Sequence, residues 1–389
     1  SDGFSALFAA AAFDPLYGLD AAGNPYATLA DALPSKLGNG CKVTLRPGLK
    51  TAAGRALAAA DLLASMTRAR SRGAAGLLGE LENPKPVAND PLSVTFAQGS
   101  PDVVARALAS PLLALVPRGF SPLAPDGTGA FRAELSRGRA LLTRNLNAAR
   151  GPAFLDAVEV TAASDMAELL RGFESAAADI GWFGTGLYKA VKDALAFETP
   201  RYGFAVLQAG KQAGAWGAPG TVQSLLDAVP AQQLAHLGLR GLSARASGSQ
   251  RWGGPPATIA VLASAPQLVA VARALATTLS APGHELTVSE KNAEELAALR
   301  DSKQYALLVD LVRAAGATTR ETELVLRTAA SPEAAKRAPK TASLLPRELG
   351  RQLTLGVVGE LTVYGARRAA FAGLESWQLG AVWQRPPAT

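Results

Sequence analysis

The chain has 389 residues, of which 48% are hydrophobic and 18% are charged, so it is long enough for two or three domains and is not intrinsically disordered. The formal net charge of +7 raises the question of nucleic acid. However, the basic residues are scattered and the aromatic residues do not alternate with them, which favours a solvated basic surface and no nucleic-acid partner.

Two N-terminal stretches give local predictions. The apolar run from Phe4 to Phe13 is too short to span a bilayer, and its spacing predicts a helix with one apolar face. Residues 43–66 read "VTLRPGLKTAAGRALAAADLLASM". This pattern predicts a strand, a break at Arg46-Pro47-Gly48 and an alanine-rich helix, and it contains no nucleophile, metal ligand or phosphate loop.

Two further regions predict α/β structure. Residues 156–183 read as a strand, a helix with Asp165 as N-cap, and a second strand, an arrangement typical of a parallel crossover. Residues 258–316 predict β-α-β-α-β, with Asn292 as the cap of the second helix. Because the two regions lie about a hundred residues apart, they indicate two lobes, and we place the boundary near Tyr202.

Residues that would carry catalysis or hold a metal are sparse. His236 and His284 are the only histidines, and nearly fifty residues separate them, so we expect no metal site and place each at a surface or a helix end. Cys41, the single cysteine, has no nearby histidine and is interpreted as a buried small residue. The glycine-rich stretches 126–131 and 181–189 match no phosphate-binding motif. We therefore expect no catalytic residues, no cofactor and no enzyme activity.

Aromatic residues are the clearest candidates for a binding site. Trp182, Phe183 and Tyr188 follow a predicted strand at its carboxyl end, where ligands bind in open α/β sheets. Tyr202, Phe204 and Trp216 follow at the expected lobe boundary. Core packing is the alternative for each ring, and the group as a whole favours the wall of a cleft.

Several motifs occur in the order found in a known family. The strings, in chain order, are "YATLADAL", "VTLRPGLKTAAGRALAAADLLASM", "PLSVTFAQGSPDVVARALASPLLALVPRG", "GTGAF", "LLTRNLNA", "FLDAVEV" with "LLRGFESAAADIGW", and "PRYGFAVLQ". Each is weak alone, but together they run through almost the whole chain. In this order they resemble the solute-binding proteins of ABC importers, family 5, which take dipeptides, oligopeptides and nickel complexes. The resemblance makes the Arg46-Pro47-Gly48 stretch scaffold of the first lobe.

Two departures from the family pattern concern the ligand. Residues 51–54 read "TAAG" where family members commonly have "FHDG". Residues 312–321 read "VRAAGATTRE" where peptide binders usually have an acidic loop, so this stretch has Arg313 and no aspartate. Because a buried ammonium needs a paired carboxylate, a standard peptide with a free amine is in doubt. Arg313 is instead a candidate for binding a carboxylate or phosphate, with a surface arginine as the alternative.

The resemblance implies an α/β, two-lobed periplasmic-binding-protein-like fold of type II, the large peptide-binding class, with mixed sheets in each lobe and a cleft between them. The expected domains are residues 1–202 as lobe I, with a small subdomain at about 40–125, residues 203–360 as lobe II, and residues 361–389 as the return to lobe I. The candidate ligand-binding residues are Trp182, Phe183, Tyr188, Tyr202, Phe204, Trp216 and Arg313.

The implied function is capture of a small organic ligand, peptide-like or other, in the interlobe cleft for an ABC importer, by hinge closure. The partners are then the ligand and a membrane permease, and we expect a monomer. The location is periplasmic or otherwise extracytoplasmic, with anchoring through a removed N-terminal segment as one option. The alternative is a carrier of a lipid or other hydrophobic molecule that is not coupled to import.

Overall fold

The computed structural model describes residues 9–20, 22–78, 81–136, 138–183, 194–198, 202–242, 250–314, 319–331, 334, 344–362 and 364–369. The described residues divide into two compact units, here called unit 1, residues 9–169, and unit 2, residues 170–369. The lobe assignments 1–202, 203–360 and 361–389 stay predictions.

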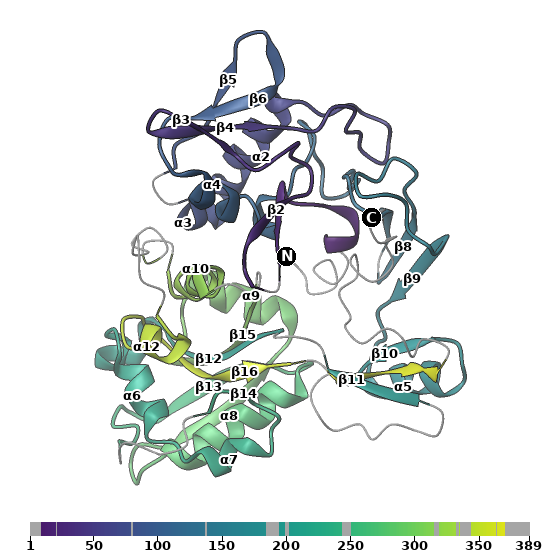
Figure 1. The fold of residues 1–389 in the computed structure, drawn as a ribbon. Helices are drawn as coiled ribbons and strands as arrows, with labels where there is room; N and C mark the ends of the chain where they lie inside the picture. The colour runs from purple at the N-terminus through teal and green to yellow at the C-terminus, as the bar shows by residue number, and fades with distance from the viewer. Residues whose placement is uncertain are drawn as a thin grey trace. The chain divides into compact units, whose positions relative to one another are not determined.

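The described part of unit 1 contains three antiparallel sheets (Figure 1). Their strands, in sheet order, are β1 (Tyr17–Leu19) and β2 (Pro25–Ala27); β3 (Ser35–Leu37), β4 (Gly40–Thr44), β6 (Asp90–Phe96) and β5 (Lys85–Val87); and β7 (Phe131–Ser136), β8 (Arg139–Arg144) and β9 (Ala157–Thr161). The helical segments are α2 (Ala59–Ala69), η1 (Arg70–Ala74), α3 (Ala75–Leu78), α4 (Pro101–Ala107) and η2 (Pro111–Leu113).

The predicted strand–turn–helix of residues 43–66 is confirmed. Strand β4 leads into a turn in which Gly48 has a φ of +75°, a conformation that glycine adopts without steric cost. Asp61, in the first turn of α2, accepts a hydrogen bond from the backbone N–H of Ala58 at 3.0 Å and so caps the helix. The buried face of α2 includes Leu62 and Met66, four residues apart, so the helix packs as scaffold.

Near the N-terminus, residues 9–12 are helical, and Ala11 and Ala12 are buried. The beginning of the predicted helix, Phe4 to Phe8, lies outside the described residues. Among the helices that the structure describes, none combines the length and the apolar character needed to cross a membrane.

The parallel crossover predicted for residues 156–183 is wrong, although its elements are present. Strand β9, helix α5 (Met166–Glu174) and strand β10 (Ile180–Trp182) occur in the expected order. However, β9 pairs antiparallel with β8, and β10 pairs antiparallel with β17 (Tyr364–Arg368). The two strands therefore belong to different sheets, because each found its partner elsewhere in the chain.

The main sheet of unit 2 has five strands. Their order is β14 (Leu286–Lys291), β13 (Ala257–Leu262), β15 (Leu307–Arg313), β12 (Gly203–Ala209) and β16 (Leu355–Leu361). Strand β13 is parallel to both of its neighbours, so the predicted β-α-β-α-β region is confirmed, with α8 (Pro266–Leu279) and α9 (Ala293–Ser302) as its helices. The predicted cap is also confirmed, since Asn292 Oδ1 accepts a hydrogen bond from Glu295 N at 2.9 Å.

Helices cover both faces of this sheet (Figure 1). Side chains alternate along β12: Ala205 and Leu207 join the core beneath α6 (Thr221–Asp227), α7 (Ala231–Ala235) and α8. Phe204 and Val206 join the opposite core, beneath α10 (Thr319–Ala330) and α12 (Pro346–Gly350). Strand β12 is thus buried on both sides, as a central strand should be.

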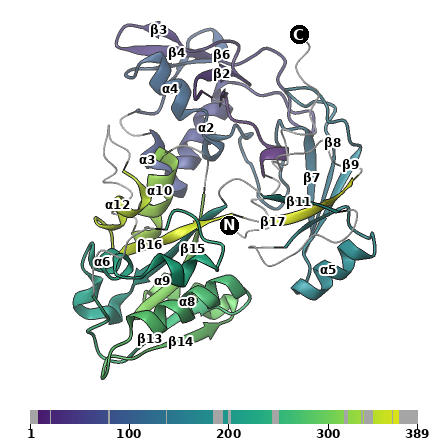
Figure 2. The ribbon, with the colours of Figure 1, turned by 60° about the horizontal axis from the view of Figure 1, so that its bottom comes forward.

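Unit 2 also has a three-stranded sheet, in the order β10, β17 and β11 (Ala194–Glu198). Strand β17 follows β16 after only residues 362 and 363. Figure 2 shows β16 and β17 as successive yellow strands that belong to the two different sheets. Strands β11 and β12 are likewise close in sequence and lie in the two sheets, so two chain segments run from one sheet to the other. A short helical segment, η3 (Lys211–Gly217), follows β12.

Candidate functional site

The candidate site lies in unit 2, at the carboxyl end of strand β15. Arg313 is the last residue of that strand, and its guanidinium carbon lies 4.9 Å from the centre of the Tyr202 ring. Strands β13, β14 and β15 run parallel, so their carboxyl ends share this edge of the sheet. In open α/β sheets, this edge is where ligands bind.

The backbone fixes Tyr202 beside Arg313. Tyr202 donates its N–H to the carbonyl of Leu361 at 2.8 Å and accepts from the N–H of Ala314 at 3.0 Å. The next residue, Gly203, pairs with Arg313 across the sheet, and a Cβ atom there would lie 2.5 Å from the carbonyl oxygen of Val312. Only glycine permits this close approach of the two strands.

Two buried polar side chains lie nearby in the sequence: Thr362, in the connection between β16 and β17, and Arg367, in β17. Thr362 follows Leu361, and its hydroxyl has no hydrogen-bond partner among the described residues. Arg367 is buried on β17, where its backbone pairs with Ile180 on one side and Leu195 on the other. Burying a guanidinium on a central strand is costly unless its charge and its N–H donors are paired.

The arrangement at Arg313 suits recognition, not bond-breaking. Its guanidinium offers several N–H donors in a planar fork, which matches the two oxygens of a carboxylate or phosphate. The Tyr202 ring beneath it limits the orientations of the guanidinium and presents an apolar surface. A guanidinium stacked on an aromatic ring is a combination able to hold an anionic group that is attached to an apolar or planar part.

Trp182 and Phe183, both predicted to bind a ligand, pack against other rings. Phe183 is buried, with its ring centre 5.5 Å from that of Phe173 at an interplanar angle of 78°. Trp182 is half-buried and lies 6.5 Å from Phe197, at 90°. Both contacts have the edge-to-face geometry that aromatic rings prefer in a core, so they favour the packing interpretation.

The remaining predicted residues lie elsewhere. Phe204 is fully buried in the core under α10 and α12, which also favours packing. Trp216 packs against the opposite core, with its ring centre 5.1 Å from that of Trp252. Tyr188 lies outside the described residues. Among the candidates that the structure describes, Tyr202 and Arg313 are in direct contact.

Sequence reasoning missed Thr362, Arg367 and Trp252. Trp252 is among the largest fully buried side chains, and its indole N–H donates to the carbonyl of Pro255 at 2.8 Å. It stands beside Gly253 and Gly254, outside any periodic pattern, so no sequence signal indicates its burial. Arg367 is buried because β17 lies between β10 and β11, and nothing in the local sequence indicates that central position.

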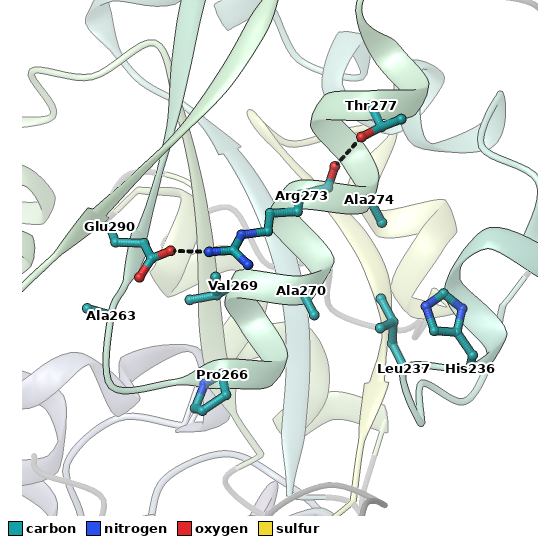
Figure 3. Close-up of a pocket in the computed structure, with 10 residues that line it drawn as sticks. All are labelled: His236, Leu237, Ala263, Pro266, Val269, Ala270, Arg273, Ala274, Thr277 and Glu290. Atoms are coloured by element: carbon teal, nitrogen blue, oxygen red, sulfur yellow. Dashed lines mark hydrogen bonds and ion pairs between the residues drawn. The ribbon is translucent and has the colours of Figure 1, made fainter.

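Unit 2 also contains a surface pocket of about 520 Å³ along helix α8 (Figure 3). At one side Arg273 pairs with Glu290 at 2.7 Å, and the hydroxyl of Thr277 donates to the carbonyl of Arg273 at 3.0 Å. His236, at the end of α7, lines the other side. The polar groups of Arg273, Thr277 and Glu290 bind one another, and none of the predicted ligand-binding residues lines this pocket.

The two histidines lie apart. His236 is exposed at the end of α7, and a ring nitrogen of His284 donates to the carbonyl of Gly254 at 2.5 Å. Within the part of the chain that the structure describes, no three histidine, cysteine, aspartate or glutamate side chains are grouped in a way that could hold a metal ion.

Cys41 is fully buried in strand β4, and burial raises the pKa of its thiol. Because the thiolate is the reactive form, we expect no reaction with 5,5′-dithiobis(2-nitrobenzoate) at pH 8 in the folded protein. Reaction of about one thiol per chain is expected after unfolding in guanidinium chloride. Rapid labelling of the native protein would contradict the burial of Cys41.

Comparisons with known proteins place this geometry in context. No protein-family model matches the sequence, and no curated protein sequence matches it. Solved structures do match. NikA from Staphylococcus aureus in complex with Ni(L-His)2 has a TM-score of 0.69 at 13% identity, covering 92% of this chain and 90% of that one. The binding protein AgaA from A. tumefaciens R10, in complex with agropinic acid, has a TM-score of 0.67 at 15% identity, covering 93% and 88%.

A third match is the oligopeptide-binding protein AppA from Bacillus subtilis, in complex with a nonapeptide. Its TM-score is 0.72 at 12% identity, and the match covers 99% of this chain and 95% of that one. At these identities the likeness concerns the fold, and it extends over nearly the whole of each chain. It confirms the fold that the order of the sequence motifs predicted. The chain therefore has the two-lobed α/β fold of the solute-binding proteins that include the peptide-binding and nickel-binding class.

Proposed function

We propose that this chain is a solute-binding protein that captures a small organic ligand for an ABC importer. The fold supports a binding role, since NikA was solved with Ni(L-His)2, AgaA with agropinic acid and the oligopeptide-binding protein AppA with a nonapeptide, and PrgZ is described as a pheromone receptor. The finer prediction, that the ligand is enclosed between two lobes that close over it, is part of this proposal.

The observation that carries the proposal is the Tyr202–Arg313 pair at the carboxyl end of β15. It supports a ligand with a carboxylate or phosphate group next to an apolar or planar part. A permease of an ABC transporter is then the expected partner, and a periplasmic or otherwise extracytoplasmic location follows. We expect the binding protein to act as a monomer.

Native mass spectrometry of gently purified protein tests the proposal. We expect a co-purified organic molecule with an acidic group, released when the protein is denatured. An apolar, uncharged molecule would instead support the alternative predicted from the sequence, a carrier of a lipid or other hydrophobic compound. Chemical turnover of the bound molecule by the purified protein would contradict both.

Arg313→Gln is expected to weaken binding of such a ligand by about tenfold or more, because a charge-assisted, forked contact is replaced by a neutral amide. Ligand occupancy after purification, measured by native mass spectrometry, gives the readout. The matched control is Arg273→Gln in the surface pocket, where we expect unchanged occupancy. An equal loss of ligand occupancy in both variants would show that Arg313 does not bind the ligand directly.

A further inference from the structure

Three loops of unit 1 form one surface, here called the loop cluster: residues 46–58, 117–128 and 145–151. The first two are joined because Ala52 N donates to the carbonyl of Gly127 at 2.9 Å, and Ala53 N donates to Asp126 Oδ1 at 3.0 Å. Arg55 adds a third link, from its guanidinium to the carbonyl of Arg118 at 2.5 Å.

The third loop is held by two contacts. The guanidinium of Arg46 donates to the carbonyl of Ala149, and Ala149 N donates to the carbonyl of Thr128 at 3.0 Å. The first contact joins the third loop to the first, and the second joins it to the second. The Arg46-Pro47-Gly48 turn, to which the sequence assigned no chemistry, therefore lies at the centre of this cluster.

The loop cluster is basic. Its five basic residues are Arg46, Lys50, Arg55, Arg118 and Arg150, and Asp126 is its one acidic residue. Two buried carboxylates below it hold three of the arginines: Asp61 lies 3.7 Å from Arg55 and 3.4 Å from Arg118, and Asp14 lies 3.8 Å from Arg150. Lys50, Arg55, Arg118 and Arg150 are exposed and Arg46 is partly buried, and with Asp14 and Asp61 counted the cluster still has five basic groups against three acidic ones.

The same loops expose leucines. Leu123 has 89% of its surface accessible and Leu146 has 82%, the two highest values among the exposed large hydrophobic residues. Leu123 stands in a tight turn in which Ala124 N donates to the carbonyl of Ser121, and Leu146 follows the buried Asn145. Both side chains are thus held on fixed backbone and project from it. At this exposure neither side chain is covered by other described residues.

We propose that the loop cluster is a docking surface for a membrane that contains anionic phospholipids. The leucines would enter the boundary between headgroups and acyl chains, and the arginines and Lys50 would bind the lipid phosphates. This inference is independent of the proposed ligand and its site in unit 2.

The form of the surface favours lipid over a protein partner. A protein interface buries a contiguous area of about 800 Å² per partner around a packed centre. Single leucines on separate loop tips provide no such centre, but each can enter a fluid phase alone. Basic residues around them add an attraction to anionic headgroups that salt weakens.

Vesicle flotation with the full chain tests the proposal. We expect binding to vesicles of phosphatidylglycerol and phosphatidylcholine in equal parts, and at least about tenfold weaker binding to phosphatidylcholine alone. Leu123→Ser with Leu146→Ser is expected to weaken binding to the mixed vesicles by at least about tenfold at unchanged net charge. Lys50→Gln with Arg118→Gln is expected to do the same and to reduce the dependence on salt.

Matched controls come from unit 2. Leu345→Ser removes an exposed leucine and Lys211→Gln an exposed lysine, and both are expected to bind like the unchanged protein. Thermal melting of each variant checks that it is folded. Absence of vesicle binding would overturn the proposal, as would binding that the leucine pair does not alter, since that would be adsorption of a basic protein. If the protein is retained on immobilised polyglutamate but binds no vesicles, the loop cluster would be a docking surface for an acidic protein and not for a membrane.

Discussion

Phe204→Ala is expected to lower the free energy of unfolding of unit 2 by about 4 kcal/mol. Phe204 is fully buried on the central strand β12, in the core formed with α10 and α12. Truncation removes the ring from a site between sheet and helices that the backbone of a central strand cannot collapse to fill. This large loss is what the packing interpretation of Phe204 requires.

Denaturant unfolding followed by tryptophan fluorescence gives the measurement, because Trp216 and Trp252 pack in the same unit. Tyr202→Ala, two residues earlier, is the matched control. Its ring is only half-buried, so we expect a smaller loss of stability together with reduced ligand occupancy. A Phe204→Ala protein of nearly unchanged stability that has lost its co-purified ligand would show that Phe204 contacts the ligand.

Local signals explain which parts of the fold the sequence predicted. In residues 258–316 the buried strands, the apolar positions of α8 and the Asn292 cap lie within a few residues of the elements that they define. Their connections also obey the rule that a helix between consecutive strands gives parallel pairing. For this region, local pattern and sheet topology agree, and the prediction succeeded.

The same rule failed for residues 156–183 because the partners of the strands are distant in the chain. Strand β10 pairs with β17, near the other end of the sequence, and β9 pairs with β8. Nothing in the local sequence of β10 indicates which strand lies next to it. The helix between β9 and β10 was predicted correctly, and the sheet that it was expected to complete does not exist.

For the aromatic residues, the sequence could not separate a binding role from packing. A large ring needs to be covered, and the sequence does not distinguish cover by a ligand from cover by another ring. Phe183 is covered by Phe173, and Trp216 by Trp252, and neither partner had been considered. The pairing of Tyr202 with Arg313 depends on the register of β12 against β15, which only the structure supplies.

Glu323→Gln is expected to lower the free energy of unfolding by about 3 kcal/mol, because it leaves a buried guanidinium with a neutral partner. Glu323 and Arg327 lie one turn apart on α10, with side chains only 5% and 6% exposed. Arg327 Nε donates to Glu323 Oε1 at 2.8 Å, and Arg327 Nη2 also donates to Gln352 at 3.3 Å. Loss of the carboxylate charge leaves the desolvation of Arg327 uncompensated.

An exposed ion pair of the same unit provides the comparison for this variant. Arg273 and Glu290 are 67% and 41% exposed, so Glu290→Gln should cost less than about 1 kcal/mol. Replacing both members of the buried pair by leucine should restore most of the stability, since no charge then remains in the core. Denaturant unfolding of the three variants measures these differences. If Glu323→Gln proved as mild as Glu290→Gln, water would have to reach the Arg327 guanidinium, and α10 would not be packed as the structure places it.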